Sequence, residues 1–230
     1  MKDRQVLITG GSGGLGTAVT ALFVERGARV TAPVFNQMQL NRLIEALGED
    51  AARVEMPMAD LRHEGDVRHV LESMDGVDVV VHLIGGFAMG PTDECTVEAF
   101  TEQLTLNLTT AFLVIKHGLR MMKLGGYGRI VTVGSRSALH PVAQQAAYSA
   151  AKAGVVALTR SVAEETRDLD ITANCVLPSI IDTPANRAAM GDADAHKWVT
   201  PKRLAEAIAY LASEKAGDLR GTTLPVYGQV

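Results

Sequence analysis

Cysteine is scarce in this sequence, with two residues in a chain of 230. Cys95 and Cys175 match neither a metal-ligand nor a redox spacing, so we expect two reduced thiols and no metal site. The first residues, MKDRQVLITGG, enter an apolar run without the hydrophobic region and cleavage site of a secretory leader. Both features favour a cytoplasmic protein.

Long hydrophobic runs and blocks of basic residues are absent as well. The longest apolar run is far shorter than the roughly 20 residues that cross a bilayer, so we expect no membrane partner. Lys and Arg number 22 against 26 Asp and Glu, for a net charge of −4 without a basic cluster, so we expect no nucleic-acid partner. Hydrophobic residues nevertheless make up 47%, and residues 1–230 are most simply one domain.

Apolar runs rich in β-branched residues alternate with segments of helical periodicity along the chain. Seven such runs predict a doubly wound, Rossmann-type α/β fold, with a parallel seven-stranded sheet and helices on both faces. Ligands of such sheets bind beyond the carboxyl ends of the strands. We expect strands over residues 5–9, 29–34, 53–56, 78–83, 128–133, 171–176 and 223–226, and helices over residues 15–26, 38–47, 64–74, 100–124, 145–167 and 201–212.

A glycine-rich turn, TGGSGGLG at residues 9–16, lies between the first expected strand and the first expected helix. Gly10, Gly14 and Gly16 follow the spacing G-x-x-x-G-x-G. Glycine permits positive φ and close approach of a pyrophosphate, and the following helix N-terminus supplies free N–H groups. A tight turn alone would explain the glycines, but their place after the first strand of such a sheet favours a dinucleotide site.

Together with YSAAK at residues 148–152, this turn resembles the short-chain dehydrogenase/reductase family over the whole chain. Ser135 stands 13 residues before Tyr148, and Asn107 lies in LNLTTAF, as in the family. The resemblance implies an NAD(P)-dependent oxidoreductase whose catalytic residues are Asn107, Ser135, Tyr148 and Lys152. It implies that the cofactor is bound by Thr9, Gly10, Ser12, Gly14, Leu15, Gly16, Asp60, Leu61, Gly85, Gly86, Tyr148, Lys152, Pro178, Ile181 and Thr183, with Asp60 at the adenine.

The sequence departs from the family pattern in several places. The family's Asn-Asn-Ala-Gly reads His82-Leu83-Ile84-Gly85 here, and Ser179 replaces the glycine of a Pro-Gly pair. The end of the second strand, VTAPVFN, offers neither the Asp common in NAD-preferring members nor an Arg for a 2′-phosphate, and Gly13 stands where NADP-preferring relatives often carry a basic residue. We therefore expect NAD or NADP, with a slight preference for NAD.

Tyr148 and Lys152 are four residues apart on an expected helix and so share one face. A nearby ammonium should lower the pKa of the phenol from its usual value near 10. Tyr148 would then exchange a proton with the substrate oxygen, Ser135 would hydrogen-bond that oxygen, Lys152 would bind the nicotinamide ribose, and Asn107 would join Lys152 to a water chain. An isolated Y-x-x-x-K would more simply be a packed tyrosine and a solvated lysine, but the neighbouring motifs favour catalysis.

Several other polar positions keep two interpretations. His82 is either a hydrogen-bonded core residue or a catalytic one. Arg136 and His140 lie either at the substrate entrance or simply on the surface. A stripe of small and aliphatic residues on the helix of Tyr148 belongs either to the core or to a subunit interface; its members are Ala146, Ala150, Gly154 and Leu158.

The segment DTPANRAAMGDADAHKW, residues 182–198, resembles the corresponding region of dihydropteridine reductase. We interpret residues 182–200 as a substrate lid that begins with Thr183 at the nicotinamide and ends with Trp198 as an anchor. Asn186, Arg187 and Met190 would lie over the substrate. Asp182 and Asp192 or Asp194 are alternatively caps of short helices.

The function that the sequence favours is hydride transfer between a nicotinamide cofactor and the carbonyl or alcohol of a small molecule or acyl thioester. One alternative is a quinonoid dihydropteridine reductase. Another is a non-catalytic NAD(P)-sensing protein, which would not need Ser135, Tyr148 and Lys152 together. The resemblance further implies a homodimer or homotetramer assembled through the two long helices.

Overall fold

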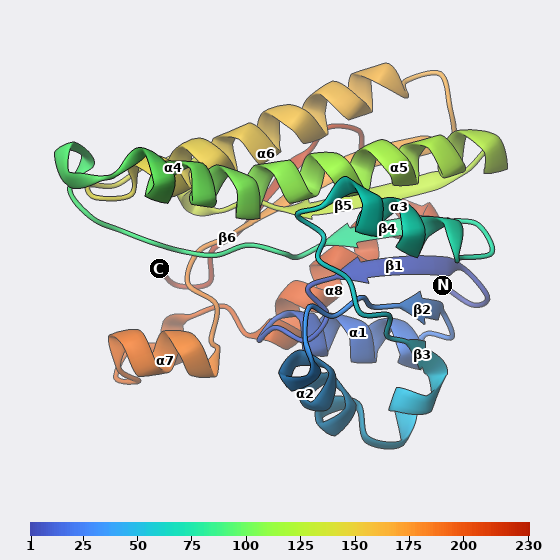
Figure 1. Ribbon diagram of the computed structural model, residues 1–230, viewed down its shortest axis with the longest axis horizontal. Helices are drawn as coiled ribbons and strands as arrows, with labels where there is room; N and C mark the ends of the chain where they lie inside the picture. Colours follow the sequence, from blue (N-terminus) through green and yellow to red (C-terminus); the bar gives the residue numbers. More distant parts are fainter.

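The computed structural model describes residues 1–230 and contains one parallel sheet of seven strands, in the order β3-β2-β1-β4-β5-β6-β7 (Figure 1). The chain runs from β1 outward to β3, then returns to β4 and continues to β7, so the strand order reverses between β1 and β4. This confirms the Rossmann-type fold and places the expected ligand crevice at that reversal. The strands are β1 (Gln5–Thr9), β2 (Arg29–Thr31), β3 (Val54–Glu55), β4 (Val79–His82), β5 (Gly128–Val133), β6 (Ile171–Pro178) and β7 (Thr223–Val226).

The central strands are apolar on both faces because helices cover the sheet on both sides. In β1, Val6 and Ile8 pack into one hydrophobic core, whereas Leu7 packs into the other. In β4, Val79 and Val81 alternate with Val80 in the same way. This double burial explains why the strands appear in the sequence as continuous apolar runs.

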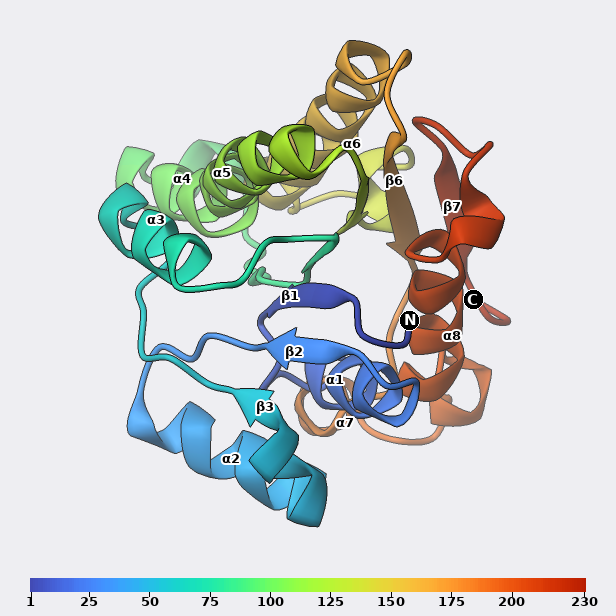
Figure 2. The same cartoon turned by 90° about the vertical axis from the view of Figure 1, so that its right-hand side faces the viewer.

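Two helical layers enclose the sheet (Figures 1 and 2). One core contains residues of α1 (Gly16–Glu25), α2 (Gln37–Leu47) and α8 (Pro201–Leu211). The opposite layer consists of α3 (Glu64–Glu72), α4 (Val97–Leu104), α5 (Thr110–Gly125) and α6 (Ala146–Glu165). The short helix α7 (Pro184–Met190) stands away from both layers, at the carboxyl end of the sheet (Figure 1).

Strand β2 ends earlier than the sequence predicts, at Thr31 instead of residue 34. Pro33 has no N–H to donate to a neighbouring strand, which interrupts the ladder. The chain remains extended, because Val34 bridges Met58 in parallel register. Strand β6 instead continues to Pro178, which pairs with Val226.

The long helix expected over residues 100–124 runs from Val97 to Gly125 but contains a π-helical turn at Thr105–Thr109. Such a turn holds one residue more than an α-turn, and single insertions of this kind occur frequently at functional sites. Asn107 lies at its centre. Hydrophobic periodicity does not reveal one extra residue, so the sequence could not predict this turn.

Candidate active site

The glycine turn places the chain in a conformation that side chains would prevent. Gly10 has a φ of 72°, in the left-handed region. A Cβ atom at Gly16 would lie 2.0 Å from the carbonyl oxygen of Gly10, so this position accepts no side chain. Helix α1 begins at Gly16 without a side-chain cap, and the N–H of Thr17 already donates to the carbonyl of Gly13 at 3.0 Å. The N–H groups of Gly14 and Leu15, just before the helix, have no backbone partner and are available to an anion. The turn therefore fits the pyrophosphate of a dinucleotide.

A cleft of about 400 Å³ opens beside this turn, between β1, α2 and the ends of β3 and β4. Of the predicted cofactor residues, Gly10, Ser12, Asp60, Leu61 and Gly85 line it. Four further lining residues carry no signal in the sequence, because they come from a helix and from loops outside the motifs: Phe35, Gln39, Arg42 and Arg62.

Asp60 is paired with an arginine of the same loop. Its carboxylate accepts hydrogen bonds from Arg62, with a closest distance of 2.7 Å, and Arg62 also lies over the ring of Phe35 at 5.2 Å. The hydrogen bond from Arg62 holds the pKa of Asp60 below its ordinary value. Arg42, by contrast, is exposed and forms no ion pair. The cleft thus presents one uncompensated positive charge.

His82 is a core histidine. Its side chain is buried, with Nδ1 2.9 Å from the hydroxyl of Thr9 and Nε2 3.3 Å from that of Thr110. The Thr110 hydroxyl donates to the carbonyl of Leu106, so it accepts from Nε2–H, and Thr9 donates to Nδ1. Burial lowers the pKa of His82 to about 3, so the ring is neutral. Both ring nitrogens are occupied, which decides between the two interpretations.

Lys152 and Asn107 meet behind the loop that follows β4. Lys152 is buried, and its Nζ donates to the carbonyl of Val133 at 3.0 Å. Burial lowers the pKa of Lys152 to about 8. A Cβ at Gly85 would lie 2.7 Å from Asn107 Oδ1 and 2.9 Å from Lys152 Nζ, so only glycine leaves room for both groups.

The side chain of Asn107 also holds Gly86, the next residue of that loop, through the backbone N–H and carbonyl of Gly86. Its Oδ1 accepts from the N–H of Gly86 at 3.2 Å, and its Nδ2 donates to the carbonyls of Gly86 and Gln103, both at 3.0 Å. The side chain is fully buried. Asn107 therefore fixes the loop against the π-helical turn, a role that sequence reasoning missed.

Tyr148 lies on the first turn of α6, one turn before Lys152. The Lys152 amino group is 5.9 Å from the centre of its ring. Burial raises the pKa of Tyr148 above its ordinary value, and a hydrogen bond with Ser135 acts in the opposite direction. The net lowering of the Tyr148 pKa that the sequence leads us to expect is wrong for this structure, because burial outweighs the groups that favour the phenolate.

Ser135 caps a short 3₁₀ turn, Arg136–Ala138, directly after β5. Its Oγ accepts from the N–H of Ser137 at 3.2 Å, and the side chain is buried. The strand end of β5 and the first turn of α6 thus bring Ser135 and Tyr148 together, as their separation in the sequence predicts.

The segment 182–200 is structured by contacts within itself. Thr183 caps α7 and packs against Gly14, where a Cβ would lie 2.8 Å from the threonine methyl group. Asp182 does not cap a helix: its carboxylate accepts two hydrogen bonds from Arg187, at 2.6 and 2.8 Å. Trp198 is 6% exposed and anchors the end of the segment, as expected.

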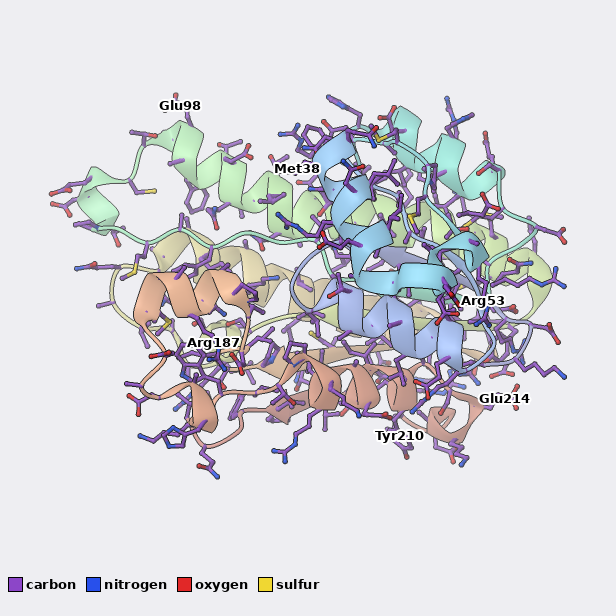
Figure 3. The ribbon with its side chains drawn as sticks, turned by 90° about the horizontal axis from the view of Figure 1, so that it is seen from below. Met38, Arg53, Glu98, Arg187, Tyr210 and Glu214 are labelled. Atoms are coloured by element: carbon purple, nitrogen blue, oxygen red, sulfur yellow. The ribbon has the colours of Figure 1, made fainter.

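Two of the three side chains expected over a substrate are tied to the segment itself. Arg187 pairs with Asp182, and Asn186 donates to the carbonyl of Ile181 at 2.8 Å. Figure 3 shows Arg187 on α7, at the end of the molecule opposite Glu214. Asp194 does not cap either and pairs with Lys197. Met190 is 59% exposed and remains free for a ligand.

The remaining polar and small residues are distributed over the surface and the core. Arg136 and His140 are exposed, and the Arg136 guanidinium lies 5.4 Å from the ring centre of Tyr227. Of the helical stripe, Gly154 packs against Leu108 and Leu158 adjoins the core, whereas the remaining two alanines are exposed.

Two further features lie away from this region. A larger hollow of about 590 Å³ is lined by Arg4, Tyr127, Arg129 and Asp170, at the amino ends of the strands and remote from Tyr148. The structure contains no cluster of three or more metal-binding side chains. Its helices are too short or too polar to span a bilayer.

Comparison with known proteins identifies the chain. The family model described as short chain dehydrogenase matches residues 4–193. This protein belongs to the short-chain dehydrogenase family. It is 30% identical to the 3-oxoacyl-[acyl-carrier-protein] reductase FabG of Vibrio cholerae, over 99% of this chain and 97% of the relative. It is 33% identical to the corresponding reductase MabA of Mycobacterium avium, over 98% and 89%.

Solved structures agree with this assignment. Levodione reductase superimposes with a TM-score of 0.90 at 27% identity, covering 99% of this chain and 97% of that protein. A variant of actinorhodin polyketide ketoreductase with NADPH gives 0.90 at 28% identity, covering 99% and 98%. The short-chain dehydrogenase studied here is thus an NAD(P)-dependent oxidoreductase. The slight preference for NAD finds no support, since this relative contains NADPH.

Proposed function

We propose that this short-chain dehydrogenase reduces a ketone with NADPH. The observation that carries the proposal is a protonated, half-buried Tyr148 next to Ser135 and the buried Lys152. The phenol carries its proton at neutral pH, so it can donate that proton to an oxygen that gains negative charge. Burial makes the phenol a weaker acid, so the direction of the reaction rests instead on the relatives, which are named as reductases of 3-oxoacyl groups.

The residues around the carbonyl have separate tasks. A nicotinamide cofactor held at the glycine turn would supply the hydride. Ser135 donates a hydrogen bond to the carbonyl oxygen, and the Tyr148 hydroxyl transfers its proton to that oxygen as the alcohol forms. Lys152, whose pKa of about 8 leaves it largely charged at neutral pH, stabilises the resulting phenolate. Asn107 acts indirectly by holding Gly86 and the adjoining Gly85 in place.

The proposed substrate class comes from the relatives of this chain and from the segment of residues 182–200. Relatives that cover nearly the whole chain are named as reductases of 3-oxoacyl groups on acyl carrier protein. We therefore propose that the substrate of this chain is a 3-oxoacyl thioester or a related β-keto compound. Residues 182–200 would act as its lid, in which Met190 is exposed and is not tied to the segment by a hydrogen bond.

The cofactor preference rests on charge. The cleft beside β2 contains Arg42 and Arg62, and its one carboxylate, Asp60, is already paired with Arg62. The end of β2 has no acidic residue to accept hydrogen bonds from a free ribose. A 2′-phosphate brings negative charge to this position, so NADP(H) fits the cleft better than NAD(H).

Replacing Tyr148 tests the mechanism. Tyr148→Phe should lower kcat for ethyl acetoacetate by about 10²–10⁴-fold, the usual contribution of a general acid, because the proton donor is lost. NADPH affinity, measured by fluorescence titration, should stay within about threefold of wild type. An active Tyr148→Phe enzyme would contradict the assignment.

Replacing Arg42 tests the cofactor preference. Arg42→Gln should weaken binding of 2′,5′-ADP by about 10- to 150-fold, since a charged hydrogen bond contributes about 1.5–3 kcal/mol. Binding of 5′-ADP should change little. Arg53→Gln, an exposed arginine outside the cleft, serves as the matched control. Equal losses for the two nucleotides would rule out recognition of the phosphate by Arg42.

A substrate panel separates the remaining alternatives. The sequence interpretation of residues 182–198 as similar to dihydropteridine reductase, which none of the relatives named above supports, makes quinonoid dihydropterin the second substrate to assay. Turnover of this pterin without turnover of β-keto esters would favour the alternative. NADPH binding without turnover of any carbonyl or pterin would favour a sensing protein.

A further inference from the structure

Phe87 is an exposed aromatic residue in contact with Tyr148. Its ring centre lies 5.0 Å from that of Tyr148, and the two planes meet at 82°, an edge-to-face arrangement. Yet 56% of Phe87 is exposed. A large apolar side chain that touches the proton donor and is still more than half exposed is placed to contact a group bound at that donor.

The loop of residues 83–91 holds Phe87 firmly. Asn107 bonds both backbone groups of the preceding Gly86. A Cβ at Gly86 would lie 2.5 Å from a methyl group of Leu106, so the loop packs closely against the π-helical turn. Farther along, the N–H of Gly90 donates to the carbonyl of Gln144 at 2.8 Å. The backbone is thus held on both sides of Phe87, at Gly86 and at Gly90.

The loop that carries Phe87 is apolar. Its residues 83–91 contain no charged or polar side chain, whereas the joined segment 138–145 carries His140, Gln144 and Gln145 beside its apolar residues. The Gly90–Gln144 bond joins it to residues 138–145, where Leu139 and Val142 are 43% and 56% exposed. Met89 is 60% exposed. Exposed apolar side chains gathered on two joined loops indicate a surface for an apolar ligand group.

We propose that Phe87 is a specificity-determining residue, which selects ketones with a bulky apolar group, such as an aryl ring, on the reacting carbonyl carbon. The proposal rests on the reductase function proposed above and adds the substituent that the site accepts. With the carbonyl oxygen at Tyr148 and Ser135, a group on the carbonyl carbon reaches the neighbouring Phe87 ring. A methyl group would leave that ring in contact with water, whereas an aryl group covers it.

Two β-keto esters that differ at this substituent provide the test. Ethyl benzoylacetate and ethyl acetoacetate carry a phenyl and a methyl group on the reacting carbon. The wild type should prefer the phenyl ester in kcat/KM by at least tenfold, and Phe87→Ala should reduce that ratio by at least tenfold. Phe87→Leu, which keeps an apolar wall, should retain most of the preference. Tyr210→Ala, an exposed aromatic residue on α8 far from α7 (Figure 3), should leave the ratio unchanged.

A second readout needs no turnover. Because burial raises the pKa of Tyr148 and Phe87 covers its ring, Phe87→Ala should shift the ultraviolet titration of Tyr148 to lower pH. The Phe87→Ala/Tyr148→Phe double variant identifies which signal belongs to Tyr148. The titration shows that Phe87 shields Tyr148, and the ester ratio shows whether it also selects the substrate; a purely structural role would lower the melting temperature and leave the ester ratio unchanged.

The outcomes separate the two proposals. An active Phe87→Ala enzyme with the wild-type ester ratio would overturn the role of Phe87 and leave the reductase function standing. Failure of the wild type to reduce either ester, with NADPH bound, would overturn the reductase function and the proposed selection together.

Discussion

Lys152 is a buried lysine whose amino group donates to the carbonyl of Val133. Burial lowers the pKa of Lys152 from 10.5 to about 8. The folded state therefore binds this proton less tightly than the unfolded state does. The cost of burying the charged form is fully present below pH 8, and it disappears as the pH rises from about 8 toward 10.5. The protein tolerates this cost to keep a cation beside Tyr148.

Lys152→Met should consequently stabilise the fold while abolishing reductase activity. We expect the free energy of unfolding to rise at pH 7 by on the order of 1–3 kcal/mol, less the lost hydrogen bond to Val133. The difference from wild type should shrink as the pH rises above about 8. Urea unfolding at several pH values measures it, with Lys123→Met, at an exposed lysine of α5, as the control. A destabilised variant at pH 7 would contradict the energetic argument.

Individual residues show where sequence reasoning was reliable and where it was not. The motif spacing correctly predicted that Ser135, Tyr148 and Lys152 come together. The direction of the Tyr148 pKa was wrong, because neighbours that lie far away in the sequence, such as Phe87, contribute to its burial. Spacing indicates proximity, but solvent exclusion depends on everything packed around the group.

The turn between β1 and α1 tolerates no side chain at Gly16. Its geometry requires Gly16 to face the carbonyl of Gly10 without a Cβ. Strand β1 and helix α1 can adjoin this closely only when the residue at their junction has no side chain. This requirement is local, and for that reason the glycine spacing made it visible in the sequence.

Gly16→Ala should separate the backbone segments of this turn. The alanine methyl group would lie 2.0 Å from the Gly10 oxygen, so the turn must shift. We expect a loss of about 1–3 kcal/mol in stability and at least tenfold weaker NADPH binding. Gly65→Ala on α3, where a Cβ meets no atom within 4 Å, should instead be neutral or stabilising by up to about 1 kcal/mol. Calorimetry and nucleotide titration compare the two, and a Gly16→Ala protein with wild-type nucleotide affinity would contradict this account.

For the molecule as a whole, the outer layer of α4, α5 and α6 leaves aromatic residues exposed. Phe112 on α5 is 47% exposed and Phe100 on α4 is 38% exposed. Neither belongs to the cleft beside the glycine turn. We expect these helices to form a subunit interface, as the family resemblance implies.

Phe112→Glu should therefore change the assembly. Light scattering coupled to gel filtration should give two or four times the monomer mass for the wild type and a lower mass for the variant, because a charge replaces a large apolar contact. Leu124→Glu adds the same charge at the end of α5, where the side chain is 90% exposed, and this variant should keep the molecular mass of the wild type. A monomeric wild type would disprove the expected homo-oligomer.

The sequence by itself determined the order of the elements, the parallel sheet, the glycine turn and the residues of the family motifs. These depend on local rules, since periodicity, turn chemistry and spacing act between residues that are near each other in the chain. Only the tertiary structure decided that His82 belongs to the core, that a π-helical turn presents Asn107 to Gly86, and that Arg42 and Phe87 reach the site. Their roles depend on segments that meet in space but are separate in sequence, and no local pattern records such contacts.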